Sequence, residues 1–193
     1  MKVLIIYAHP RKDSFNQAIL KRVEGVLAEL QQDVIIRDLY AMNFDPVFRA
    51  EEQAKLQKNR TPATIKTEQK HISWADMLII IHPIWWFSMP AILKGYIDKV
   101  LQAGFAYSYV NGKVIGLLQN KKLLLINTTG TPEKAMEQKG IKDVLQTTMD
   151  TGIYEFCGLK VEHIFLAGVS YIDEKAREAY LDQVESHLWQ EFK

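Results

Sequence analysis

Residues 77–96 read MLIIIHPIWWFSMPAILKGY, and this stretch joins a strand, a loop and the start of a helix. An apolar run of strand length ends at His82-Pro83, and a helical pattern begins at Pro90. The residues between, 83–87, form a tryptophan loop. Because loops lie on the surface, large aromatic side chains there are costly unless they cover something flat and apolar. The tryptophan loop is therefore the first candidate for a binding site, facing a planar ligand or another subunit.

The rest of the chain alternates between the same two kinds of pattern. Apolar runs without polar alternation predict five strands buried on both faces, at residues 2–7, 33–37, 77–82, 122–127 and 160–166. Apolar positions three and four apart predict helices at 15–31, 90–102, about 141–154 and 173–192. This order predicts an α/β fold with a doubly wound parallel sheet, in one domain that spans residues 1–193.

Two long connections, 39–58 and 105–116, interrupt the alternation. The second is rich in aromatic residues and carries the turn pair Asn111-Gly112. Residues 59–67 are the most polar stretch, and we expect them to be the most mobile because they offer little to bury.

Composition excludes several classes of partner. The 24 Lys and Arg nearly balance the 23 Asp and Glu, so no charged field favours nucleic acid. Cys157 is the lone cysteine and no signal peptide is evident, so a cytoplasmic protein is expected. The apolar stretch 77–93 contains a histidine and two prolines, which predicts no integral membrane segment. The five histidines lack metal-ligand spacing, so no metal site is expected.

Three predicted loops share the sheet edge formed by the carboxyl ends of the strands, where such folds bind ligands. They are residues 8–16, 82–87 and 128–132. Ser14 and Asn16 open a helix, where hydroxyl, amide and free backbone N–H groups favour an anion. Taken alone, this pair is more typical of an ordinary helix cap. Neither a Walker loop nor GxGxxG is present, which argues against an ATPase and an ordinary dinucleotide-binding dehydrogenase.

Flat aromatic walls and backbone donors on one rim suit a planar, hydrogen-bonding ring attached to a phosphate, which is the shape of a flavin. Residues 128–130 could bring hydroxyl groups to the polar edge of such a ring, although they also fit an ordinary polar turn. His9 is expected to donate to the phosphate, and His82 to be a satisfied core residue. Cys157 has no nearby base, so a nucleophilic role is not expected.

Taken together, the motifs resemble the NAD(P)H:quinone oxidoreductase family, whose members include DT-diaphorase and the cytosolic ancillary proteins of bacterial potassium efflux systems. The resemblance spans nearly the whole chain and rests on residues 7–10, 14–16, 38–44, 83–95, 105–107, 128–130 and 156–158. It implies a flavodoxin-like sheet of order 2-1-3-4-5 with helices on both faces.

The resemblance also implies roles for individual residues. The flavin phosphate and ribityl chain would be held at the first loop by His9, Ser14, Phe15, Asn16 and Ala18. The ring would be lined by Pro83, Ile84, Trp85, Trp86, Phe87, Thr128, Thr129, Gly130 and Thr131. The substrate pocket would be walled by Tyr107, Tyr109 and Met136, with the tyrosines coming from the second subunit of a homodimer whose sites lie at the interface.

The implied activity is a two-electron hydride transfer from NADH or NADPH through the flavin to a quinone, by a ping-pong mechanism. Azo and nitro compounds are further candidate acceptors. The alternative is a flavin-binding regulatory subunit of a membrane potassium efflux system. A one-electron flavodoxin is disfavoured because the chain is nearly neutral, and a receiver domain because 8–10 lack an acidic cluster.

The chain departs from the family pattern at three places. Met136 and Lys142 stand where mammalian relatives carry a tyrosine and a histidine that stabilise charge on the reduced flavin, and we hypothesise that the Lys142 ammonium replaces them. Thr131-Pro132 replaces a more glycine-rich loop. Arg177 matches an arginine that reaches the adenine half of FAD, whereas the shortened segment 59–67 favours FMN, so both cofactors stay open.

Overall fold

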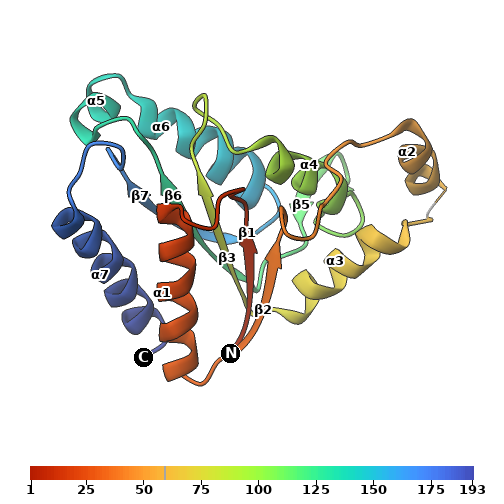
Figure 1. The fold of residues 1–193 in the computed structure, drawn as a ribbon. Coiled ribbons are helices and arrows are strands. Elements are labelled where there is room, and N and C mark those ends of the chain that lie inside the picture. The colour runs from red at the N-terminus through yellow and green to blue at the C-terminus, as the bar shows by residue number, and fades with distance from the viewer. Residues whose placement is uncertain (59) are drawn as a thin grey trace.

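A five-stranded parallel sheet forms the centre of the chain, with helices on both faces (Figure 1). The computed structural model describes residues 1–58 and 60–193. The strands of this sheet are β1 (Lys2–Tyr7), β2 (Asp33–Asp38), β3 (Met77–Pro83), β6 (Lys122–Thr128) and β7 (Lys160–Leu166). Their spatial order is β2-β1-β3-β6-β7. Both the predicted strands and the predicted flavodoxin-like order are confirmed.

Three predicted helices are confirmed as α1 (Phe15–Glu29), α4 (Ala91–Val100) and α7 (Glu174–Glu191). The predicted helix at 141–154 is divided into α6 (Ile141–Leu145) and a π-helix, η1 (Gln146–Glu155). Three helices were not predicted: α2 (Ala50–Gln57), α3 (Ala63–Trp74) and α5 (Glu133–Gln138).

Helix α3 begins within residues 59–67, the stretch expected to offer little to bury. Residues 63–67 form its first turns, and Ile65 is buried there. Glu68 and Ile72 follow on the same buried face, three and seven positions later. The polar surroundings of Ile65 conceal this spacing. Residue 59 lies outside the described residues.

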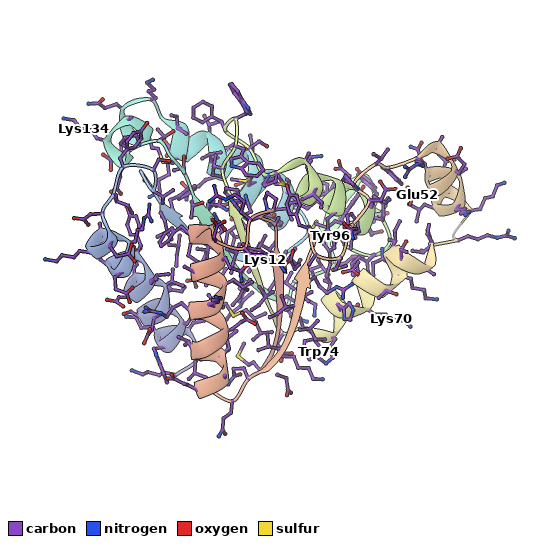
Figure 2. The ribbon with its side chains drawn as sticks, in the orientation of Figure 1. Lys12, Glu52, Lys70, Trp74, Tyr96 and Lys134 are labelled. Carbon is purple, nitrogen blue, oxygen red and sulfur yellow. The ribbon has the colours of Figure 1, made fainter. Side chains whose placement is uncertain are left out.

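The sheet separates two apolar layers, because successive side chains on each strand point to opposite faces. On β3, Leu78 and Ile80 join the layer that includes Tyr96 of α4, whereas Ile79 and Ile81 join the layer beneath α1 and α7. Figure 2 shows Tyr96 in the interior. Within the described residues, no helix is both long and apolar enough to cross a membrane.

The predicted connection 105–116 contains a two-stranded antiparallel hairpin of β4 (Tyr107–Val110) and β5 (Lys113–Gly116). Asn111 and Gly112 have φ of 52° and 74°, as a tight hairpin turn requires. A Cβ on Gly116 would lie 2.3 Å from the backbone nitrogen of Gly158, so the hairpin base packs directly on that turn. The predicted turn pair is confirmed, and it holds the β4 tyrosines at the surface.

Candidate active site

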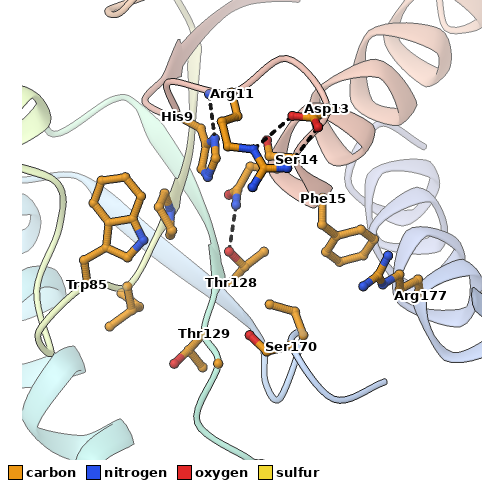
Figure 3. Close-up of a pocket in the computed structure, with 15 residues that line it drawn as sticks. His9, Arg11, Asp13, Ser14, Phe15, Trp85, Thr128, Thr129, Ser170 and Arg177 are labelled. Atoms are coloured by element: carbon orange, nitrogen blue, oxygen red, sulfur yellow. Dashed lines mark hydrogen bonds and ion pairs between the residues drawn. The ribbon is translucent and has the colours of Figure 1, made fainter. Parts of the chain in front are cut away.

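The carboxyl ends of β1, β3, β6 and β7 enclose a cavity of about 470 Å³, which we call the rim cavity (Figure 3). Many of the residues predicted to bind a cofactor line it, namely His9, Ser14, Phe15, Asn16, Pro83, Ile84, Trp85, Thr128, Thr129 and Gly130. It is completed by Arg11, Asp13, Val169, Ser170 and Arg177. Val169 and Ser170 had not been considered, although they follow the fifth strand on the same sheet edge.

The start of α1 forms the end of the rim cavity at which an anion is predicted to bind. The Ser14 hydroxyl accepts a hydrogen bond from the Gln17 backbone N–H at 3.1 Å, so Ser14 caps the helix. The N–H groups of Phe15 and Asn16 lie in the first turn, where a helix offers them no carbonyl partner. The cap is therefore compatible with the predicted anion site, since it leaves these two donors free for a ligand.

His9 is a defined hydrogen-bond donor at the same end. The Arg11 backbone N–H donates to His9 Nδ1 at 3.1 Å, which places the ring proton of neutral His9 on Nε2. Burial lowers the pKa of His9 and so favours this neutral form near pH 7. The ring lies against Trp85, with centroids 5.7 Å apart and planes tilted by 60°.

Asn16 joins the start of α1 to the end of β6. Its side chain is buried, and Nδ2 donates to Thr128 Oγ1 at 2.7 Å. Its Oδ1 has no hydrogen-bond partner within residues 1–58 and 60–193, and the same is true of Arg177 Nε. Because buried polar atoms are normally paired, one acceptor and one donor at the rim cavity call for a ligand with matching groups.

The tryptophan loop ends in a tight turn closed by two backbone hydrogen bonds between Trp85 and Ser88, at 2.9 and 3.0 Å. The two central residues, Trp86 and Phe87, have φ of 51° and 53°, which is strained for side chains of this size. Trp86 is 98% exposed and Phe87 56% exposed. Of the three aromatic residues in the tryptophan loop, Trp85 lines the rim cavity and the other two face outward.

The remaining predicted residues do not line the rim cavity. Ala18 lies on α1, one turn after the lining residue Ser14. Thr131 follows the lining residue Gly130, and Met136 is buried in α5. The Lys142 ammonium lies 5.6 Å from the centroid of the Phe165 ring.

Tyr107 and Tyr109 lie on β4, where they form an aromatic cluster with Phe156. The centroid of Tyr107 is 5.9 Å from that of Tyr109 and 5.0 Å from that of Phe156. Phe156 had not been predicted as a site residue. Its position follows from the packing of the hairpin on residues 157–158, which no local pattern reveals.

Comparisons with known proteins agree with the fold. The model of the flavodoxin-like fold family matches residues 1–188. An uncharacterized NAD(P)H oxidoreductase of Haemophilus influenzae is 38% identical over 94% of the chain and 91% of the relative. NAD(P)H dehydrogenase [quinone] 1 of Rattus norvegicus is 32% identical over 98% of the chain and 78% of the relative. The solved NAD(P)H:quinone oxidoreductase of Methanothermobacter marburgensis is 29% identical, with a TM-score of 0.86 over 96% of the chain and 94% of that structure.

Proposed function

We propose that the chain, which belongs to the flavodoxin-like fold family, is a flavin-dependent NAD(P)H:quinone oxidoreductase. Its relatives are named NAD(P)H oxidoreductase and NAD(P)H dehydrogenase [quinone] 1. The observation that carries the proposal is the rim cavity, where unpaired polar atoms, a free helix N-terminus and an aromatic wall meet. These are the groups that a ring bearing a ribityl phosphate requires.

The residues that line the rim cavity support a flavin site along its length. His9 Nε2–H and the N–H groups of Phe15 and Asn16 would hold the phosphate. The unpaired Oδ1 of Asn16 would accept from a ribityl hydroxyl group. We favour FMN because the segment 59–67, which would supply a further contact to the adenine half of FAD, is short. Arg177, with its unpaired Nε, is the residue that would contact the longer FAD.

A bound flavin supplies hydride transfer between a reduced nicotinamide and a two-electron acceptor. The chain contributes orientation: Pro83, Ile84 and Trp85 form one wall, and Thr129 and Gly130 form the polar edge. NADH or NADPH and the acceptor would bind in turn against the uncovered face of the flavin ring, which is a ping-pong scheme. Quinones are the proposed acceptors, and azo and nitro compounds share the flat shape that this face would admit.

We further propose that two chains form a homodimer with the sites at their interface. The outward-facing Trp86 and Phe87, and Tyr109 of the hairpin, are large apolar side chains that water would otherwise cover. In this arrangement Tyr107 and Tyr109 of one subunit, together with Phe156, would cover the cavity of the other. Met136, which is buried in α5, stays a predicted residue of that pocket through the family resemblance alone.

An absorption spectrum of the purified protein, followed by anaerobic addition of NADH or NADPH, tests the proposed function. We expect a flavin band that bleaches on addition and returns when a quinone is added. Heat-released flavin separated by chromatography distinguishes FMN from FAD. A colourless protein that also takes up no added FMN or FAD would refute the proposal, and a coloured protein that does not bleach would refute the reductase activity.

A further inference from the structure

A chain of buried polar side chains lies behind the rim cavity, on the sheet face opposite α1. His163 of β7 contacts Asp150 of η1 through Nδ1, at 3.0 Å from both carboxylate oxygens. Its Nε2 lies 2.6 Å from Oδ1 of Asn127 on β6. Asn127 Nδ2 donates to the backbone carbonyl of His82 on β3, at 3.2 Å. We call Asp150, His163 and Asn127 the polar chain.

Hydrogen bonding fixes where the protons of the polar chain lie. The His82 carbonyl can only accept, so Asn127 must direct its NH₂ group there and its oxygen toward His163. His163 Nε2 must then carry a hydrogen. Since Nδ1 faces the Asp150 carboxyl group, a second proton lies between those two groups, and the pair has no net charge. Every link therefore has a donor and an acceptor.

The polar chain acts where the sheet ends and the loops of the rim cavity begin. His82 precedes Pro83, and Asn127 precedes Thr128, whose carbonyl accepts from the Ile84 N–H at 2.7 Å. Deeper positions on the same face of β6 are the apolar Leu123 and Leu125. On this face of β3 and β6, polar residues thus replace apolar ones only at the carboxyl ends, at His82 and Asn127. His163 lies in the middle of β7, in register with Leu125, and reaches Asn127 from there. Directional bonds fix a geometry that apolar packing leaves looser.

We propose that Asp150, His163 and Asn127 are positioning residues that hold the ends of β3 and β6 in the geometry needed by the rim cavity. They touch no ligand themselves. The consequence for flavin binding rests on the proposed function, whereas the effect on the two strand ends does not.

Two replacements of Asp150 separate positioning from simple packing. In Asp150→Asn, the new amide can donate to Nδ1 of neutral His163, so every link is preserved, and we expect affinity for FMN to stay within about threefold. Asp150→Leu leaves His163 Nδ1 without a partner, and we expect a loss of about tenfold or more. Asn127→Leu keeps the number of side-chain heavy atoms, removes both hydrogen bonds that Asn127 makes, and should behave like Asp150→Leu.

Leu123→Ala is the matched control, because it removes buried volume from the same face of β6 at the far end of the strand. FMN dissociation constants come from fluorescence quenching, and hydrogen exchange of the Ile84 and Thr129 amides is measured without ligand. Faster exchange at these amides in Asp150→Leu and Asn127→Leu, but not in Asp150→Asn or Leu123→Ala, is the expected result. Equal effects in Leu123→Ala, or unchanged exchange throughout, would overturn the proposal.

Failure of the proposed function gives a different result. A wild-type protein that binds no FMN would refute flavin dependence, yet hydrogen exchange at Ile84 and Thr129 would still decide whether the polar chain holds the two strand ends.

Discussion

Replacing His82 with phenylalanine should abolish a loss of stability that the wild-type protein undergoes in mild acid. His82 is fully buried at the end of β3. Its Nδ1–H donates to the Pro83 carbonyl at 2.9 Å, and its Nε2 has no partner within the described residues. Protonation would therefore place an unpaired charge inside the protein. Burial accordingly lowers the pKa of His82 from 6.5 to about 4, and nearby His163 contributes in the same direction.

The size and sign of the effect follow from linkage. The unfolded chain binds the proton near pH 6.5 and the folded chain only near pH 4, so the stability that neutral His82 preserves is fully present above 6.5. It is lost as the pH falls from 6.5 through about 4. At roughly 1.4 kcal/mol for each pH unit between these values, the loss approaches about 3 kcal/mol.

Urea unfolding of wild type and His82→Phe at several pH values between 7 and 4 measures this loss. The pH-dependent contributions of carboxyl groups that titrate in both proteins cancel when one free energy of unfolding is subtracted from the other. The backbone carbonyl that accepts from Asn127 is retained in the variant. We expect the difference to move by about 3 kcal/mol in favour of the variant toward low pH. A difference that does not change with pH would refute the reasoning.

Three further substitutions test the rim cavity and its surroundings. Asn16→Leu should weaken FMN binding about tenfold in a fluorescence titration by removing both of its buried polar atoms, whereas Lys21→Ala on the same helix should not. Trp86→Gly should stabilise the monomer against urea unfolding by about 1 kcal/mol, because glycine accepts a positive φ. The same replacement should weaken dimerisation measured by sedimentation, and unchanged association would exclude Trp86 from the interface. Lys142→Ala should slow anaerobic flavin reduction about tenfold in stopped-flow measurements, because it removes the ammonium group proposed to stabilise the reduced flavin. Replacement of the exposed Lys139 by alanine is the control. Equal rates in wild type and Lys142→Ala would remove Lys142 from the mechanism.

The sheet could be predicted from sequence because its cause is local. Strands buried on both faces are continuous apolar runs, and their alternation with helices leaves few topologies. Helix α3 was not predicted from the sequence because its buried face includes Glu68, which is charged. Arg37 of β2 pairs with Glu68 at 2.5 Å, and this distant partner makes the burial possible. Helix α2 has no buried residue, so it offers no apolar pattern to detect.

The candidate site could be predicted in part for the same reason. Residues 9–16, 83–85 and 128–130 follow directly from where parallel strands end. The outward position of Trp86 depends on a turn with positive φ, which sequence usually signals with glycine or asparagine and here does not. The cluster of Tyr107 with Phe156 depends on contact between segments about fifty residues apart, which only the folded chain reveals.

The turn of the tryptophan loop is better explained by binding than by folding. Two bulky residues at positive φ cost about 1 to 3 kcal/mol each, and glycine would avoid that cost. Burial does not offset the strain within the single chain, because Trp86 is 98% exposed. The backbone hydrogen bonds of the turn would form equally well with glycine. What glycine could not supply is the aromatic surface, so we infer that the strain is retained for a contact with a partner or ligand at the edge where Trp85 meets the rim cavity.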